Sequence, residues 1–189
     1  MAEELGEADG IVIIDETGFL KKGDKSAGVA RQYSGTAGRI ENQQIGVFLA
    51  YTSKRGCAFI DRELYIPEEW FQDSARCLEA GLPQGISFET KPHLAQRMVE
   101  RAIAAHIPAR WVVADTVYGT DALQVWLEAQ GFYYVLAVPY TIVSGLKAGK
   151  FQPKCLSPPN RMRRGHACQP GKEARDLATM IGLGCSCLI

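Results

Sequence analysis

The sequence has no excess of either charge. Its 21 Lys and Arg residues balance 21 Asp and Glu residues, so the formal net charge is zero. A neutral chain gives no general argument for nucleic-acid binding, but it still allows a local basic patch. The sequence has no apolar run of the roughly 18 to 20 residues that span a bilayer, and its acidic start does not resemble a secretory signal. We therefore expect a cytoplasmic protein with no membrane part.

Cysteine pairs with metal-ligand spacing are also scarce. Of the six cysteines, Cys185 and Cys187, with His166 nearby, suggest half of a zinc site. A structural zinc site needs two such sets of ligands. Because the second set is missing, we favour free thiols in a reduced protein.

Short apolar runs separated by amphipathic segments predict an α/β protein. We expect strands at 11–14, 44–51, 57–64, 111–114 and 132–138, and helices at 70–80, 91–106 and 120–130. Residues 16–38 are interpreted as a long, basic, Gly-rich connection. Three antiparallel strands followed by a βαβ unit predict a mixed sheet with helices on its faces.

Burial on both faces of such a sheet predicts a set of core side chains. These are Ile11, Ile13, Val47, Leu49, Phe59, Val112, Val135 and Leu136. Beyond about residue 145 the hydrophobic periodicity disappears. We therefore expect a globular domain over residues 1–145 and an irregular or disordered tail over residues 146–189.

Two carboxylates stand out because each follows a buried run. Asp15 follows the run at 11–14, and Asp115 follows the run at 111–114. If the two strands are adjacent and parallel, the carboxylates lie side by side and repel each other unless a cation neutralises them. Hard oxygen ligands suit Mg²⁺ or Mn²⁺. A single Asp at a strand end would more simply cap the next turn, but the matched pair favours a metal site.

The connection after Asp15 carries basic and polar side chains. These are Lys21, Lys22, Lys25, Arg31, Gln32 and Arg39. Glycines let a backbone approach a phosphate closely, and lysines neutralise its charge. Such a run is usually a solvated loop, but beside two carboxylates it indicates a phosphodiester substrate.

Several motifs in order resemble one protein family. They are DETGFLKKG at 15–23, SAGVARQY at 26–33, LYIP at 64–67, TKP at 90–92 and VADTVYG at 113–119. From about Gly10 to about Val143, the chain resembles the catalytic domain of bacterial insertion-sequence transposases of the DDE superfamily.

This resemblance implies a ribonuclease-H-like fold and a catalytic Asp-Asp-Glu triad, of which Asp15 and Asp115 match the two aspartates. It implies DNA transposition by metal-dependent phosphodiester cleavage and strand transfer, with two Mg²⁺ or Mn²⁺ ions. It also implies DNA as partner (transposon ends and target), a homo-oligomer, and a location at the bacterial nucleoid.

The third acid of that triad has no match in this sequence. The resemblance places a Glu on a helix after the fifth strand, and nothing after Val138 is typical of that helix. We therefore expect a truncated, catalytically incomplete domain. From about Asn160, one shifted-frame reading with chosen synonymous codons resembles the stretch that follows the fifth strand in this family, which predicts a frameshifted tail.

Two other functions stay open. A haloacid-dehalogenase-type phosphatase also begins with a strand and a nucleophilic Asp, but it needs a second Asp two residues later, where this chain has Thr17. An aspartyl-phosphate on Asp15 would support it. The other alternative is a non-enzymatic remnant that binds DNA weakly, with salt-sensitive binding and no nicking.

Overall fold

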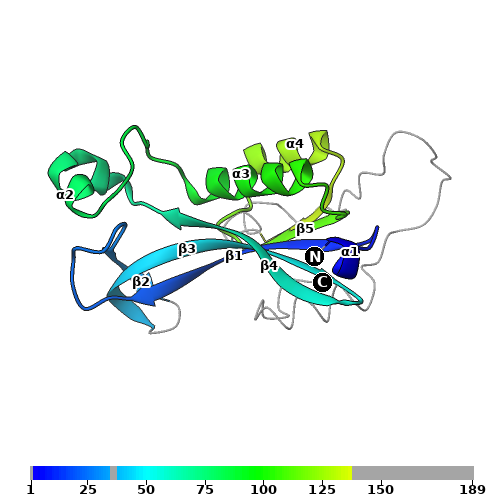
Figure 1. Ribbon diagram of the computed structural model, residues 1–189, viewed down its shortest axis with the longest axis horizontal. Coiled ribbons are helices and arrows are strands. Elements are labelled where there is room, and N and C mark those ends of the chain that lie inside the picture. The colour runs from blue at the N-terminus through cyan, green and yellow to red at the C-terminus, as the bar shows by residue number, and fades with distance from the viewer. Residues whose placement is uncertain (1, 35–37, 138–189) are drawn as a thin grey trace, which may run out of the picture. The chain divides into compact units, whose positions relative to one another are not determined.

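The computed structural model describes residues 2–34 and 38–137 of the chain. These residues form a six-stranded mixed sheet with a few helices (Figure 1), which confirms the predicted mixed α/β class. The elements in chain order are α1 (Ala2–Leu5), β1 (Ile11–Leu20), β2 (Ala30–Ser34), β3 (Arg39–Ser53), β4 (Gly56–Tyr65), η1 (Glu68–Gln72), α2 (Ser74–Glu79), α3 (Lys91–Ala104), β5 (Trp111–Ala114), α4 (Asp121–Ala129) and β6 (Tyr133–Leu136).

Strand β1 joins the antiparallel and parallel halves of the sheet. The strand order is β2-β3-β1-β5-β6, with β4 also paired to β3. β1 is antiparallel to β3 and parallel to β5, which is in turn parallel to β6. The predicted series of three antiparallel strands followed by a βαβ unit is therefore confirmed for β1, β3, β4, β5 and β6.

The interpretation of residues 16–38 as a connection is wrong. β1 continues to Leu20, and residues 30–34 form the additional strand β2. Both segments are held by pairing with the long strand β3, which runs opposite Ile11–Leu20 on one side and residues 30–34 on the other. Ladder hydrogen bonds from β3 thus override the polar and glycine-rich composition, which by itself disfavours a strand.

The expected helix at 70–80 is divided in two. The 3-10 helix η1 ends before Asp73, and Asp73 then caps α2 by accepting a hydrogen bond from the backbone N–H of Arg76 at 2.9 Å. An Asp at a helix start satisfies a backbone donor that has no partner within the helix. The expected helices at 91–106 and 120–130 correspond to α3 and α4.

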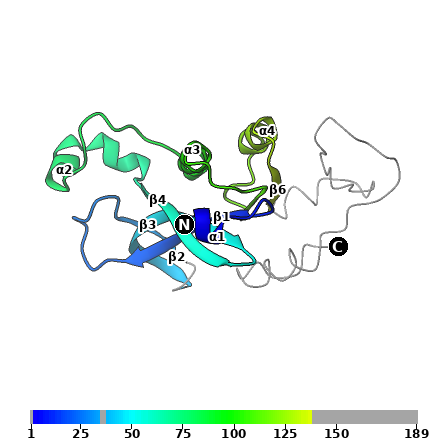
Figure 2. The same cartoon turned by 45° about the vertical axis from the view of Figure 1, so that its right-hand side comes forward.

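Helices α3 and α4 lie on the same face of the sheet, as Figures 1 and 2 both show. The core forms between this face and the two helices. Its sheet side chains are Val12, Ile14, Val47, Leu49, Tyr51, Val112 and Ala114, and its helical ones are Leu94, Ala95, Met98, Val99, Leu123 and Leu127.

The expectation that both faces of the sheet are buried is wrong for some of the predicted core side chains. Val47, Leu49 and Val112 are fully buried, and Ile11, Ile13 and Leu136 are half-buried. Phe59 is 78% exposed and Val135 is 40% exposed. Side chains alternate between the faces of a strand, and within the described residues α3 and α4 cover one face only, so positions on the other face keep contact with solvent.

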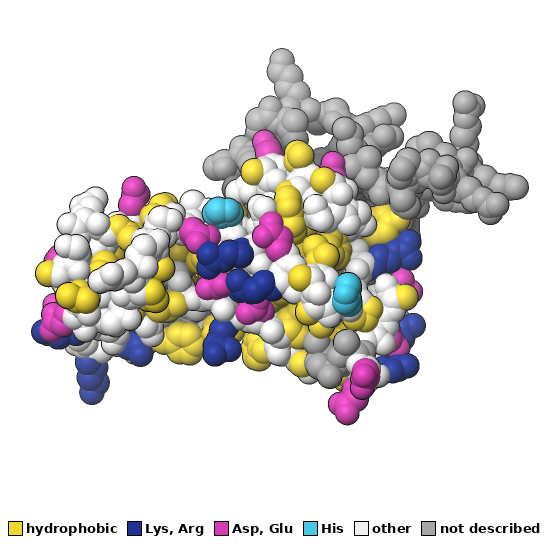
Figure 3. All heavy atoms as spheres, turned by 45° about the horizontal axis from the view of Figure 1, so that its top comes forward, with side chains coloured by type: hydrophobic (Ala, Val, Ile, Leu, Met, Phe, Trp, Pro, Cys, Tyr) yellow, Lys and Arg dark blue, Asp and Glu magenta, His cyan; other side chains and the backbone are white. Residues whose placement is uncertain are grey.

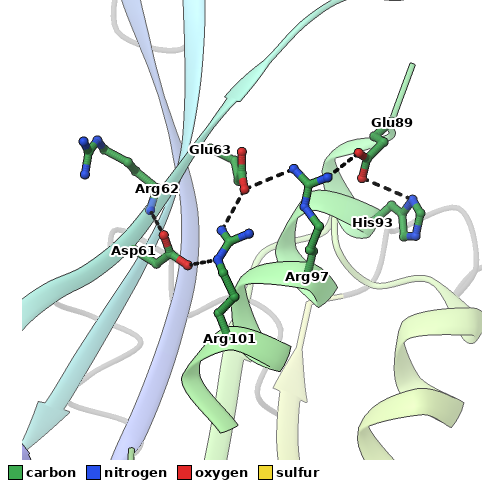
Figure 4. A network of polar contacts seen from close by, with 7 residues as sticks. All are labelled: Asp61, Arg62, Glu63, Glu89, His93, Arg97 and Arg101. Carbon is green, nitrogen blue, oxygen red and sulfur yellow. Dashed lines mark hydrogen bonds and ion pairs between the residues drawn. The ribbon is translucent and has the colours of Figure 1, made fainter. Parts of the chain in front are cut away.

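A polar network fastens α3 to β4 (Figure 4). Glu63 on β4 forms ion pairs with Arg97 at 3.1 Å and with Arg101 at 2.7 Å. Asp61 forms a further ion pair with Arg101 at 2.7 Å. Glu89 pairs with Arg97 at 2.5 Å from the segment before the helix. These ion pairs connect α3, whose first residue is Lys91, to β4.

The remaining expectations about the chain fall on other residues. The boundary near residue 145, the irregular tail, and Cys185, Cys187 and His166 lie outside the described residues. Cys57 and Cys77 are free thiols. In the part of the chain that the structure describes, no helix is both long and apolar enough to cross a membrane.

Candidate functional site

The two predicted carboxylates follow paired positions on adjacent parallel strands. Ile11–Ile14 of β1 lie in register with Trp111–Ala114 of β5, so Asp15, the next residue of β1, and Asp115, the first residue after β5, follow the same pair of positions. β5 ends there, while β1 continues beside β3. The apolar runs that place the strands in the core thus also put Asp15 and Asp115 at neighbouring positions of the sheet.

The local electrostatics are unfavourable for two negative charges. Burial raises the pKa of Asp15, and the charge of Glu16 raises it further, against a hydrogen bond from the Glu16 backbone N–H that lowers it. Burial also raises the pKa of Asp115, which Glu16 and Asp15 raise further, while the backbone N–H of Val117 and the charge of Lys91 lower it. Like charges therefore gather here with little compensation.

The donor set suits a hard divalent cation in part. Carboxylate oxygens are the ligands that Mg²⁺ and Mn²⁺ prefer, and a cation would relieve the repulsion between Asp15 and Asp115. Among residues 2–34 and 38–137, neither carboxylate forms a salt bridge with a basic side chain. The same residues contain no group of three or more side chains that could enclose a metal ion. The pair thus provides two of the ligands that such an ion needs.

The predicted basic residues lie away from the carboxylates along β1. Lys21 follows β1, six residues after Asp15, which at about 3.3 Å per residue is roughly 20 Å along the strand. Lys22 and Arg31 are exposed, and Gln32 is half-buried. Lys25 pairs with Glu79, and Arg39 pairs with Glu41 at 2.5 Å.

Charges of both signs also alternate on the face over α3 and α4. Figure 3 shows Lys and Arg side chains next to Asp and Glu side chains there, and no continuous basic area. The Arg97 and Arg101 network described above accounts for part of this pattern. The described residues of this face therefore carry mixed charge.

Three residues beside the carboxylate pair were not assigned from the sequence. The Glu16 carboxylate accepts a hydrogen bond from the Lys91 ammonium group at 2.6 Å and another from the hydroxyl of Tyr118 at 2.5 Å. Lys91 and Tyr118 come from α3 and from the turn after β5, so no spacing along the chain indicates their contact. Strand alternation was the available signal, since it places Glu16 on the same face as the buried Ile14, where a carboxylate needs a partner.

Comparison with known proteins identifies the family. The family model described as DDE superfamily endonuclease matches residues 1–180. A probable transposase for insertion sequence element IS701 from Microchaete diplosiphon is 30% identical over 154 residues, which covers 75% of this chain and 37% of that protein. The chain therefore spans just over a third of the length of this curated relative. No solved structure matches the chain. The chain belongs to the DDE superfamily endonuclease family.

Proposed function

We propose that this chain provides part of a transposase catalytic centre that cleaves DNA phosphodiester bonds with Mg²⁺ or Mn²⁺. The observation that carries the proposal is the register of β1 and β5, which makes Asp15 and Asp115 neighbours. Family membership supports transposition as the general activity. The three mutually parallel strands β1, β5 and β6, with the antiparallel strand β3 next to β1, support a ribonuclease-H-like fold over residues 1–145.

In this proposal Asp15 and Asp115 hold the cation. A divalent ion supplies a charge that activates the attacking hydroxyl and stabilises the leaving oxygen. Asp15 is exposed and lies on the face of β1 opposite to α3, a face that no described helix covers, which supports an approach of the DNA backbone from that side. The backbone N–H groups of Glu16 and Val117 each donate to one of these carboxylates, at 2.8 and 2.9 Å, which orients the remaining oxygens.

We propose further that the described residues are catalytically incomplete. The third acid that the family resemblance implies has no counterpart among them. Two carboxylates bind a divalent ion weakly and fix its position poorly, and positioning supplies much of the rate. From these two carboxylates alone we therefore expect cation binding without efficient DNA cleavage.

The test is Mn²⁺ binding, followed by paramagnetic broadening of amide signals around residues 15 and 115. Asp15→Asn and Asp115→Asn should each remove most of the broadening. Asp24→Asn, which alters an exposed Asp in the connection after β1, is the matched control and should leave it unchanged. Broadening that persists in both site variants, or none in the unaltered chain, would overturn the proposed site.

DNA is the proposed partner, bound through phosphates by the basic segment. The candidates are Lys21, Lys22, Lys25, Arg31, Gln32 and Arg39. Lys22, Lys25, Arg31 and Arg39 are exposed, and of these Lys25 and Arg39 already pair with Glu79 and Glu41. Lys22→Ala should weaken binding of duplex DNA and reduce the slope of log affinity against log salt by about one. Lys54→Ala, at the β3–β4 turn near the other end of β3, should not. Equal effects of both variants would contradict the assignment.

A further inference from the structure

Glu16 is a carboxylate on the buried side of β1. Its neighbours Asp15 and Thr17 point to the opposite face by strand alternation, whereas Glu16 follows Ile14 toward the helices. The side chains of Glu16 and Lys91 are each 19% exposed, and their charged atoms are 2.6 Å apart. A charge in such a place needs a partner with good geometry, because burial removes most of its hydration.

Lys91 reaches Glu16 from an unfavourable position for a cation. It is the first residue of α3, where the helix dipole favours negative rather than positive side chains. Its Nζ atom also lies 5.5 Å from the ring centre of Tyr65, at the end of β4. Two partners from two strands thus hold Lys91 at the site, against the preference of its own helix.

Tyr118 links the same carboxylate to the turn that carries Asp115. The Tyr118 side chain is fully buried, and its hydroxyl donates to Glu16 at 2.5 Å. Its backbone N–H donates to the carbonyl oxygen of Asp115 at 3.2 Å, and the N–H of Val117 donates to the Asp115 carboxylate at 2.9 Å. The turn is packed from the other side as well, since a Cβ on Gly119 would lie 2.4 Å from the carbonyl oxygen of Ala137.

We infer that Glu16, Lys91 and Tyr118 form a positioning unit that fixes the Asp115 turn against β1, and hence Asp115 against Asp15. Glu16 serves as the anchor for Tyr118, and Lys91 offsets part of the negative charge that Glu16 brings close to the carboxylate pair. The inference rests on the proposed cation site for its functional meaning. Its structural part, the anchoring of the turn, can be tested separately.

The decisive variant is Tyr118→Phe, which removes one hydroxyl and no other atom. Tyr51→Phe is the matched control, because Tyr51 is equally buried and its hydroxyl accepts from the N–H of Glu7 at 2.9 Å, near the other end of β1. We expect amide hydrogen exchange at Val117 and Tyr118 to rise about tenfold in Tyr118→Phe. We expect Mn²⁺ affinity to fall about tenfold in the same variant. Neither quantity should change in Tyr51→Phe by more than about twofold.

Variants at Lys91 separate positioning from direct ligation by Glu16. Lys91→Arg keeps the ion pair and should retain Mn²⁺ affinity within about twofold. Lys91→Met leaves Glu16 unpaired and should loosen the turn and weaken Mn²⁺ binding. Tighter Mn²⁺ binding in Lys91→Met would identify Glu16 as a ligand and overturn the positioning role. This variant also carries the test if Tyr118→Phe does not fold.

The two proposals fail in different ways. Unchanged exchange at Val117 in both Tyr118→Phe and Lys91→Met overturns the positioning unit, whatever happens to the cation. Mn²⁺ affinity that is unchanged in Asp15→Asn and Asp115→Asn overturns the proposed function. The hydrogen-exchange rates at Val117 and Tyr118 then still decide whether Tyr118 anchors the turn. A loosened turn with unchanged, Asp15-dependent Mn²⁺ affinity also counts against the inference.

Discussion

Gly18 lies directly against the side-chain amide of Gln43. A Cβ atom on Gly18 would meet the Gln43 Oε1 atom at 2.0 Å. Gln43 is 2% exposed, and its Nε2 atom donates to the carbonyl oxygen of Tyr33 at 2.7 Å. The glycine in β1 therefore makes room for a buried amide that joins β3 to β2.

Gly18→Ala should destabilise the fold by about 1–3 kcal/mol, because the added methyl group displaces Gln43 from its hydrogen bond. Urea unfolding measures the loss. The control is Gly23→Ala, since a Cβ at Gly23 would meet nothing within 4 Å, and it should be neutral or slightly stabilising. Equal stability of the two variants would show that Gln43 can move without cost.

Asp15→Asn and Asp115→Asn should each make the chain slightly more stable at neutral pH. Burial raises the pKa of both carboxyl groups, so the fold favours their neutral forms and the ionised forms oppose folding. An Asn side chain keeps the oxygen that accepts from Glu16 or Val117 and removes the charge. The gain is under about 1 kcal/mol, because solvent screens both groups.

The stability gained by Asp15→Asn and Asp115→Asn depends on pH. A carboxyl group with a raised folded pKa favours folding below its unfolded pKa, and this contribution is lost as pH rises through the folded pKa. The stability difference between Asp115→Asn and the unaltered chain should therefore vanish in acid and be full at neutral pH. Thermal unfolding across this range measures it, and a destabilised Asp115→Asn at neutral pH would contradict it.

Trp70→Phe should destabilise the fold by about 2–4 kcal/mol. Trp70 is fully buried, its indole N–H donates to the carbonyl oxygen of Val29 at 2.9 Å, and the Arg76 guanidinium lies 3.8 Å from its ring centre. The substitution removes the donor and part of the stacked surface. Denaturant unfolding measures the loss; Phe71→Leu, on the half-buried neighbour, should cost clearly less.

Tyr134 should titrate at unusually high pH. Burial and then the hydrogen bond to Glu128, at 2.7 Å, raise its pKa to about 12. Because the folded pKa lies above the unfolded value of about 10, this residue contributes stability below pH 10 that is lost as pH rises toward 12. Tyrosinate absorbance, measured against Tyr134→Phe, follows the group. Glu128→Gln should lower this pKa but leave it above 10, and an unchanged pKa would rule out the contribution of Glu128.

The apolar runs made much of the sheet predictable. Ile11–Ile14 and Trp111–Ala114 are short apolar runs that contain β-branched residues and are followed by Asp, and these features indicated both the strands and the carboxylate pair. Strand β2 was not predictable in this way, because its ARQYS sequence carries no apolar alternation and only its ladder with β3 makes it a strand. The contacts of Glu16 with Lys91 and Tyr118 depend on how the N-terminus of α3 and the turn after β5 meet β1, which only tertiary packing sets.

The adjacency of Asp15 and Glu16 makes the chemistry of the site depend on strand parity. A shift of β1 by one residue would turn Glu16 toward the open face and press Asp15 against Lys91. The same shift would expel Val12 and Ile14 from the core, where each is 1% exposed. The apolar face of β1 thus sets the register that places its two acidic residues. A shift that exchanged Asp15 and Glu16 would expose aliphatic side chains that have no other role at the site.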